Sequence, residues 1–352
     1  MNKFSIIIPS YNEAEKLDAS LYVIFNQIRE LSLTCEIIVV DDCSTDHTDT
    51  IVSKYTEKIK FFSTEKNSGG AGVPRNIGLK KVTTEYVIFY DIGDVLDLKC
   101  VKSLIDKMDI MDINLCVAKH IDIGIAGEIN HPLTIIFTGE DFITDLRATP
   151  YLISNPFCWS KIYKTKWIRD FDVEFGDIYC GEDKIFTWSC YLLAEKIFIS
   201  NEIMYGHKFF SGNVNRMLQR NIQLVESLIK IDKIMRIRFE HANLLALYFT
   251  RLIKRDIFGI VLANDSIKLM SLNKQLNNVT HLLNKWLINL FLESGLKVIE
   301  FLSSDEISTA KKYMKDFNLL MCADKLNEKI YIKELAHYNN YVTQLVSMNL
   351  KY

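Results

Sequence analysis

Short apolar runs alternate with helix-like segments in the first half of the chain, and this alternation constrains the fold more than any other feature. The runs span Phe4 to Ile8, Glu36 to Val40, Lys60 to Phe62 and Tyr86 to Tyr90, and they are rich in Ile, Val and aromatic residues. Between the first two runs, apolar residues recur every three or four positions, as in an amphipathic helix. This pattern predicts an α/β fold with a mixed, mostly parallel sheet.

Two helix starts can be predicted from local residue types. Asn12 and Glu15 have the spacing of a capping box at the start of the first helix. A second helix is predicted from about Thr45 to Tyr55, with Ser44 or Thr45 as its N-cap. The loops that follow parallel strands share one edge of the sheet, where open α/β folds bind ligands. In this chain they are residues 9–13, 41–48 and 91–94.

The second part of the chain has a different character. From about residue 213 the strand signals stop, and apolar residues follow the spacing of a helical bundle. We therefore predict two domains, residues 1–212 and 213–352. The first carries 22 Lys and Arg against 31 Asp and Glu, and the second carries 20 against 13. The acidic part can host a cation, and the basic part can face an anionic partner.

Composition and cysteine use exclude several protein classes. A chain of 352 residues with 49% hydrophobic content can bury a full core, which excludes a disordered tail or a small disulfide scaffold. The 8 cysteines form no CxxC pair, so neither a zinc site nor a redox motif is encoded. The apolar stretches 244–263 and 282–302 contain charged residues, and the first apolar run is too short for a signal peptide. We expect a cytoplasmic protein without membrane spans.

Paired carboxylates follow the second predicted strand. Asp41 and Asp42 could accept hydrogen bonds from a nucleobase N–H or from ribose hydroxyls. The structural alternative is helix capping. Capping by Ser44 or Thr45 would leave both Asp side chains without an explanation.

A glycine-rich segment, Lys66 to Leu79, carries a candidate phosphate-binding cation. Its glycines would let backbone N–H groups approach a ligand, and Arg75 could meet a phosphate. Arg75 stands where the dinucleotide fingerprint needs a third small residue, which argues against a dehydrogenase. The structural alternative is a flexible turn before a helix that begins near Pro74.

Two further acidic motifs follow strand or loop segments. Asp91 and Asp94 come directly after the fourth run, and carboxylates at a strand end can hold Mg²⁺ or Mn²⁺. The alternative for these two residues is an ordinary turn. Glu182 and Asp183 precede an apolar helix predicted over Ile185 to Ala194, where acids in a first turn also favour the helix dipole.

Taken together, six segments resemble family 2 glycosyltransferases of the GT-A fold in their order and spacing. The resemblance covers about residues 1 to 215 and implies a GT-A domain over residues 1–212. The all-α region 213–352 would then serve acceptor binding, membrane-surface contact or oligomerisation. The Pro-Arg-Asn segment looks most like bacterial enzymes of wall teichoic acid and capsular polysaccharide synthesis. The six segments are IIIPSYNE (6–13), VVDDCSTDHT (39–48), GGAGVPRNIGL (69–79), YDIGD (90–94), NPFCWSKIYK (155–164) and GED (181–183).

The resemblance implies roles for individual residues. Asp183 matches the catalytic base of the Glu-Asp motif, with Glu182 beside it. Trp159 and Lys161 match an acceptor-binding segment, in which Ser160 replaces the usual Asn. The implied nucleotide-sugar site consists of Pro9, Tyr11, Glu13, Asp41, Asp42, Arg75, Asn76, Asp91 and Lys208.

The metal motif departs from the family pattern. The family usually shows Asp-x-Asp-Asp, whereas this chain has Gly93 at the usual second ligand. We expect Asp91, Asp94 and His207 to hold Mn²⁺ or Mg²⁺. The alternatives are that Lys208 or Arg216 neutralises the pyrophosphate, or that activity is weak. A lone histidine such as His207 can also be purely structural.

The implied function is inverting transfer of a hexosyl or N-acetylhexosaminyl group from a UDP-sugar to a hydroxyl of a surface polysaccharide, teichoic acid or other glycan. One alternative is a catalytically silent sugar-nucleotide-binding or scaffolding module. Another is a sugar nucleotidyltransferase, although the first loop lacks the glycine-rich sequence of that class. The basic segment Lys230 to Arg255 predicts contact with the inner leaflet or a phosphate-bearing polymer, with a homo-oligomer as a further partner. The pI near 6.4 argues against nucleic acid.

Overall fold

The computed structural model describes residues 3–208, except 125, 126, 128, 131–135, 147, 150, 151, 153, 154 and 178–180. The predicted helical domain 213–352, including Arg216 and the basic segment Lys230 to Arg255, lies outside the described residues. The boundary after residue 212 therefore stays a prediction.

The four apolar runs form neighbouring parallel strands. They are β1 (Phe4–Ser10), β2 (Glu36–Asp41), β3 (Lys60–Ser63) and β4 (Tyr86–Phe89), in the spatial order β3-β2-β1-β4. Nearly all residues of β1, β2 and β4 are buried, because helices cover both faces of this part of the sheet. The predicted α/β class is confirmed.

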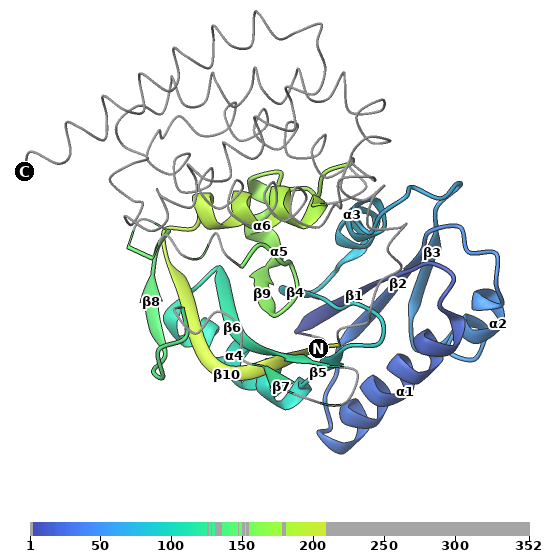
Figure 1. Ribbon diagram of the computed structural model, residues 1–352, viewed down its shortest axis with the longest axis horizontal. Coiled ribbons are helices and arrows are strands. Elements are labelled where there is room, and N and C mark those ends of the chain that lie inside the picture. Colours follow the sequence, from blue (N-terminus) through green and yellow to red (C-terminus); the bar gives the residue numbers. More distant parts are fainter. Residues whose placement is uncertain are drawn as a thin grey trace, which may run out of the picture. The chain divides into compact units, whose positions relative to one another are not determined.

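The helices lie in two layers around this sheet. Figure 1 shows α1 (Ala14–Glu30) and α4 (Leu98–Met111) on one side, and α3 (Gly72–Lys81) and α6 (Glu182–Leu193) on the other. Each of α1 and α4 presents its buried apolar residues along one stripe, as expected for a helix packed on a sheet. Two shorter helices are α2 (Thr48–Ser53) and α5 (Thr165–Asp170).

The capping box predicted for the first helix is wrong. The N-cap of α1 is Glu13, and the Ala14 N–H donates instead to the Asp46 carboxylate at 3.0 Å. Asn12 has a left-handed backbone with φ of 51°, and its side-chain oxygen accepts from the Thr45 N–H at 2.7 Å. The two loops therefore satisfy each other's backbone groups across the sheet edge, which local spacing does not reveal.

The start of the second helix is also corrected. It begins at Thr48 with His47 as N-cap, rather than at Ser44 or Thr45. The Asp46 carboxylate accepts from the Thr48 N–H at 3.1 Å and holds this first turn. The preceding residues form the loop that receives Asn12.

The second half of the sheet is mixed. Strand β9 (Lys161–Lys164) runs antiparallel to both β4 and β6 (Leu115–Ile123). Strand β10 (Ile197–Lys208) pairs with β6 in parallel along a long ladder and with β5 (Val95–Leu96) antiparallel. The short strands β7 (Ile129–Asn130) and β8 (Phe142–Thr144) complete the described sheet. Because β5 directly follows residues 91–94, β10 reaches the edge where the acidic loops lie.

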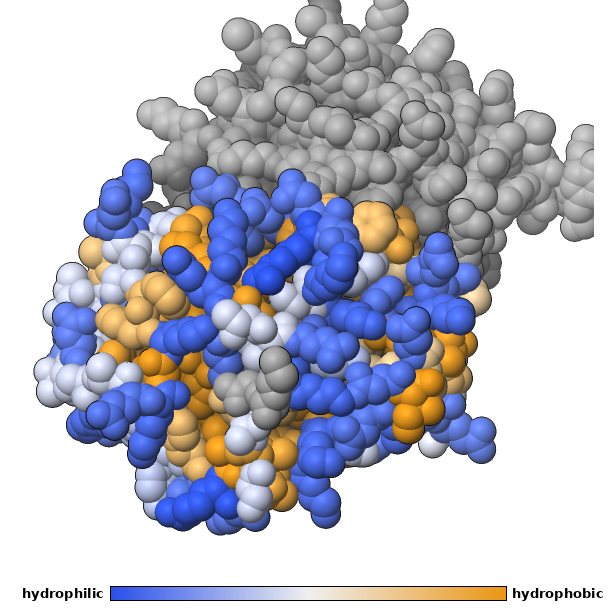
Figure 2. Space-filling view, turned by 180° about the vertical axis from the view of Figure 1, so that it is seen from behind, coloured by the Kyte–Doolittle hydropathy of each residue, from blue (hydrophilic) through white to orange (hydrophobic). Residues whose placement is uncertain are grey.

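The surface of the described part is mixed in character. The face in Figure 2 is covered mainly by hydrophilic residues, with apolar patches between them. Large apolar side chains that are exposed include Tyr22 at 65% and Ile110 at 86%. Among the described helices, none combines the length and the apolar character that crossing a bilayer requires.

Candidate active site

A cavity of about 450 Å³ opens at the carboxyl ends of the parallel strands. It is bounded by the loops after β1 and β2, the glycine-rich segment, the first turn of α3, the loop after β4 and the start of α6. This is the edge that the strand order predicted. The lining residues are Pro9, Ser10, Tyr11, Glu13, Asp42, Asn67, Gly69, Gly70, Ala71, Pro74, Arg75, Asp91, Ile92 and Glu182.

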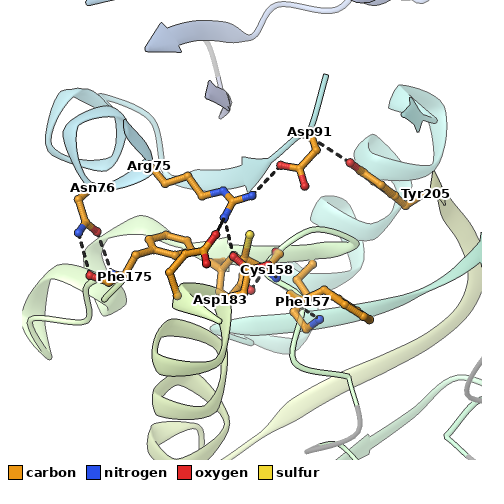
Figure 3. Close-up of polar contacts among 11 residues, drawn as sticks. Arg75, Asn76, Asp91, Phe157, Cys158, Phe175, Asp183 and Tyr205 are labelled. Carbon is orange, nitrogen blue, oxygen red and sulfur yellow. Dashed lines mark hydrogen bonds and ion pairs between the residues drawn. The ribbon is translucent and has the colours of Figure 1, made fainter. Parts of the chain in front are cut away.

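Arg75 joins the acidic motifs at one side of this cavity. Its guanidinium lies 2.7 Å from Asp91 Oδ1 through Nη2, and 2.5 Å from Asp183 Oδ1 through Nη1 (Figure 3). Nη1 also lies 3.3 Å from Glu182 Oε1. The Arg75 side chain is only 3% exposed. One fixed cation thus brings together three carboxylates that come from two separate segments of the chain.

Close helix packing makes this arrangement possible. A Cβ atom added at Gly72 would lie 2.6 Å from the Gly176 carbonyl oxygen and 3.1 Å from Glu182 Cβ. The first turn of α3 can therefore approach the first turn of α6 only because residue 72 has no side chain. The Phe175 ring packs beside the guanidinium, with Arg75 Cζ 5.4 Å from the ring centroid.

Two carboxylates beside Arg75, those of Glu182 and Asp183, hold protons more tightly than ordinary acids. Burial, followed by the charge of Asp183, raises the pKa of Glu182 to about 7. Burial also raises the pKa of Asp183, although Arg75 acts in the opposite direction. Burial alone would lower the pKa of Arg75, but its carboxylate partners outweigh that effect and raise it. A single cation cannot neutralise three acids, so this cluster is suited to accepting a proton.

Hydrogen bonds to other parts of the protein hold Gly93 and Asp94 in the loop after β4. The Asp94 carboxylate accepts from the Tyr205 hydroxyl through Oδ2 and from the Lys208 N–H through Oδ1, both at 2.8 Å. The Gly93 N–H donates to Ser20 Oγ at 3.0 Å. Burial raises the pKa of Asp94 to about 6. Both Asp94 oxygens therefore hold protein groups.

The three predicted metal ligands are not gathered as a ready-made set. His207 Nδ1 lies 3.2 Å from Asp122 Oδ1, and the His207 ring stacks on Trp159. Within the described residues, no group of three or more His, Cys, Asp or Glu side chains is placed to hold a metal ion. Asp91 lines the cavity and its side chain is 36% exposed. A single such carboxylate fits Mg²⁺ or Mn²⁺ only where substrate phosphate and water complete the shell.

The first loop and Asp42 lie where the sequence predicts nucleotide contacts. Pro9, Tyr11 and Glu13 all line the cavity, and Glu13 pairs with Lys16 at 2.6 Å. Asp42 also lines the cavity, although it is only 3% exposed. Its carboxylate accepts hydrogen bonds from Thr64, Asn67 and Ser68.

Asp41 is placed differently from Asp42. It does not line the cavity, and its carboxylate accepts from the Ser44 N–H at 2.9 Å and from the Ser44 hydroxyl. Asp41 thus shapes the loop after β2, and of the pair only Asp42 lines the cavity.

The Asn76 side chain is engaged by the protein backbone, and its nucleotide contact stays a prediction. Its amide nitrogen donates to the Phe175 carbonyl at 2.9 Å, and its oxygen accepts from the Phe175 N–H at 2.8 Å (Figure 3). Asn76 therefore ties α3 to the segment before α6. Lys208 is exposed and does not line the cavity, so its side chain does not contribute to the site as described.

The expected acceptor residues are both buried. Trp159 is 3% exposed and Lys161 is 0% exposed. Lys161 Nζ donates to Asn155 Oδ1 at 2.9 Å and to the Phe157 carbonyl at 2.5 Å, and burial lowers the pKa of Lys161 to about 7. Lys161 thus supports the segment 155–160 from inside, and acceptor contact by Trp159 or Lys161 stays a prediction.

Sequence reasoning missed residues that complete the site. Ser68 and Asn67 donate hydrogen bonds to the Asp42 carboxylate, and both lie inside the glycine-rich segment 66–79. Tyr205 contacts both Asp91 and Asp94. No local pattern marks Tyr205, because β10 reaches the site only through the sheet topology.

Comparison with known proteins assigns this part of the chain. Residues 5–171 match the family model described as glycosyl transferase family 2. These residues belong to that family. The match spans the strands and loops that carry Asp42, Arg75 and Asp91, so the predicted family is confirmed.

The relatives include several poly(ribitol-phosphate) glycosyltransferases. The chain is 32% identical over 209 residues to poly(ribitol-phosphate) beta-N-acetylglucosaminyltransferase TarS of Staphylococcus aureus strain Mu50, covering 58% of this chain and 35% of TarS. It is 29% identical to TarP of S. aureus strain N315, covering 58% and 62%. It is 30% identical to poly(ribitol-phosphate) beta-glucosyltransferase of Bacillus spizizenii, covering 58% and 32%. The chain therefore spans about a third of the length of the first of these relatives.

A solved structure supports the fold. The S. aureus TarS fragment 1–349 in complex with UDP-GlcNAc matches with a TM-score of 0.62 at 25% identity, covering 84% of this chain and 82% of the fragment. The GT-A fold class predicted for the first domain is confirmed.

Proposed function

We propose that the chain is an inverting glycosyltransferase that moves a sugar from a UDP-sugar to a hydroxyl of a teichoic-acid or related surface-glycan acceptor. The observation that carries this proposal is the meeting of Arg75 with Asp91, Glu182 and Asp183 beside the cavity. Two relatives are named as enzymes that transfer N-acetylglucosamine or glucose to poly(ribitol-phosphate), and this supports the donor and acceptor classes.

Asp183 is the proposed base. Arg75 holds Asp183 Oδ1, whereas Oδ2 lies 3.5 Å from the Cys158 N–H. Oδ2 takes the proton of the acceptor hydroxyl while that oxygen forms a bond to the anomeric carbon from the side opposite the leaving group. The bond from the anomeric carbon to the diphosphate oxygen breaks, UDP leaves with the electron pair, and the configuration inverts.

Charge on the leaving diphosphate must be neutralised. Arg75 lines the cavity and supplies a permanent cation near Asp91. Asp91 is the residue that would hold Mn²⁺ or Mg²⁺, which would add further neutralisation of the pyrophosphate when bound. The role expected for Asp94 and His207 as additional ligands stays a prediction.

Asp42 is the proposed reader of the nucleotide. A uracil N–H or a ribose hydroxyl can donate to its carboxylate, which Ser68 and Asn67 already orient. Tyr11 is 44% exposed and lines the same cavity, so it can pack against a base.

The wider context of the enzyme is also a proposal. A phosphate-bearing acceptor would suit the basic composition after residue 212. A cytoplasmic location with peripheral contact at the inner face of the membrane, and a homo-oligomer, both stay predictions.

A second candidate is a silent sugar-nucleotide-binding module. Gly93 supplies no carboxylate, and Asp94 is engaged by Tyr205 and Lys208. These two observations favour weak or absent chemistry without affecting nucleotide binding.

One experiment separates the two candidates. The full chain is incubated with UDP-GlcNAc, UDP-glucose or UDP-galactose and MnCl₂, with and without purified poly(ribitol-phosphate), and UDP release is measured. The enzyme proposal expects UDP release that the acceptor accelerates, with a product of inverted anomeric configuration by NMR. UDP binding without turnover supports the silent module, and absence of both overturns the proposal.

A further inference from the structure

We propose that Tyr205 is a positioning residue for Asp91, acting through the main chain of the loop after β4. This inference rests on the glycosyltransferase function proposed above and adds a residue that its sequence motifs do not contain. Tyr205 comes from β10, 114 residues after Asp91. Its hydroxyl lies between Asp91 and Asp94 (Figure 3 shows the contact with Asp91).

The Tyr205 hydroxyl has one proton and two acceptor positions. The proton is donated to Asp94 Oδ2 at 2.8 Å, because an ionised carboxylate can only accept. The hydroxyl oxygen is then free to accept the Asp91 N–H at 3.1 Å. The direction of both bonds follows from Asp94, so the acid fixes Tyr205 and Tyr205 in turn fixes the backbone at Asp91.

The ring of Tyr205 has almost no freedom to move. It is 1% exposed and stacks on Trp159, with ring centroids 4.9 Å apart and planes at 15°. Trp159 stacks in turn on Phe157 at 4.5 Å, and Tyr90 meets the Tyr205 ring edge-on at 6.3 Å. A hydroxyl on a ring held this firmly can define the position of a neighbouring backbone group.

The contact matters because Asp91 is the first link to Arg75. Asp91 Oδ1 lies 2.7 Å from Arg75 Nη2, and the same guanidinium holds Asp183. A shift of the Asp91 backbone would therefore move the cation that meets the leaving diphosphate. Small displacements of this kind cost rate more than binding, because the charge on the leaving group develops in the transition state.

The test compares Tyr205→Phe with Tyr86→Phe. Both side chains are fully buried, and each hydroxyl donates to a carboxylate, from Tyr86 to Asp109 Oδ1 at 2.6 Å. Tyr86 lies in β4 away from the cavity lining, so its variant reproduces the loss of a buried hydroxyl without touching Asp91. Both variants are measured as full chains for UDP-GlcNAc hydrolysis, UDP affinity by calorimetry, and thermal unfolding.

We expect Tyr205→Phe to lower kcat at least tenfold while KM for UDP-GlcNAc and the UDP dissociation constant change less than threefold. Tyr86→Phe should show a similar drop in melting temperature with unchanged kcat. Equal kcat in Tyr205→Phe and the wild type, or an equal loss in both variants, overturns the inference.

Trp159→Phe provides a second route if Tyr205→Phe fails to fold. It loosens the ring stack but leaves the hydroxyl and its partners in place, so we expect a smaller loss of kcat, about threefold, again without a change in KM. An unchanged kcat in a folded Trp159→Phe variant would then count against the inference. A wild-type chain that neither binds UDP nor hydrolyses UDP-GlcNAc would instead mean that the proposed function itself is wrong.

Discussion

Arg75 and Asp183, 108 residues apart in the sequence, form an ion pair with Nη1 2.5 Å from Oδ1. The pair fixes one carboxylate oxygen of Asp183, while the other lies 3.5 Å from the Cys158 N–H. It also places a permanent cation beside the proposed catalytic base.

Replacing Asp183 by Asn should abolish transfer while nucleotide binding is kept. Asn preserves the volume but cannot accept the proton, and loss of a general base typically costs about 10²–10⁴ in rate. Arg75 retains Asp91 and Glu182 as partners, so the fold should persist. Steady-state transfer and UDP calorimetry measure the two properties, and transfer at the wild-type rate would remove Asp183 from the role of base.

Glu182 should make stability depend on pH in a definite direction. Its pKa is raised from 4.5 to about 7, so the folded state binds this proton more tightly than the unfolded state does. The resulting stabilisation is complete below pH 4.5 and is lost as the pH rises through 7, with a total of up to about 3 kcal/mol.

Urea unfolding of wild type and Glu182→Gln between pH 4 and 8 measures this effect. The free energy of unfolding of the wild type, relative to the variant, should fall across that range. A difference that stays flat or rises with pH would contradict the raised pKa.

Asn76→Ala should act on stability rather than on nucleotide affinity. The variant loses both hydrogen bonds to the Phe175 backbone and leaves those buried groups unpaired, at a cost of about 1–3 kcal/mol. Chemical denaturation measures the loss, and calorimetry should give a UDP dissociation constant within about threefold of the wild type. A large loss of UDP affinity in a fully stable variant would restore Asn76 to the nucleotide site.

Substitutions of Asp41 and Asp42, at the end of β2, should affect different properties of the protein. Asp42→Asn should weaken UDP binding about tenfold or more, because Asp42 lines the cavity. Asp41→Asn should chiefly destabilise the loop that Ser44 closes. Calorimetry with UDP, GDP and CMP tests both variants and the wild type, and tighter binding of GDP or CMP than of UDP by the wild type would refute a uridine donor.

Activity should depend on a divalent metal ion, but the protein should bind that ion with low affinity. Asp91 is the one carboxylate of the predicted motif that lines the cavity, and divalent ions need several oxygen ligands. We expect excess EDTA to lower UDP-GlcNAc turnover about tenfold or more, and half-maximal MnCl₂ activation to need high concentrations. Full activity in EDTA would mean that cationic side chains such as Arg75 suffice.

Local pattern was enough to predict the parallel half of the fold. The four predicted strands agree with β1 to β4 to within two residues, because buried β-branched runs between helical segments have few alternatives. The loops at their carboxyl ends and the cavity followed from topology. The antiparallel strands β9 and β10 could not be placed in the same way, since their partners lie far away in the sequence.

Three of the predicted contact residues show why residue type alone is a weak guide. Asn76, Trp159 and Lys161 carry the residue types of a ligand contact, but each contacts other groups of the protein itself. For Asn76 and Trp159 these groups lie far away in the sequence. A polar side chain near a site satisfies its hydrogen bonds with whichever partner the tertiary fold brings, and residue type alone does not identify that partner. Tyr205 was missed because its contacts with Asp91 and Asp94 arise only from the tertiary fold, and its residue type does not indicate them.

Gly93 restricts which side chains this loop can accept. Its φ of +93° suits glycine, while an added Cβ would meet only Lys16 Cδ, at 3.9 Å. A carboxylate at position 93 would therefore have room, but the backbone would resist it. Replacing Gly93 by Asp would therefore strain the turn unless its backbone conformation changed as well. Engineering a third acidic ligand into this loop would have to begin with the turn and not with the side chain.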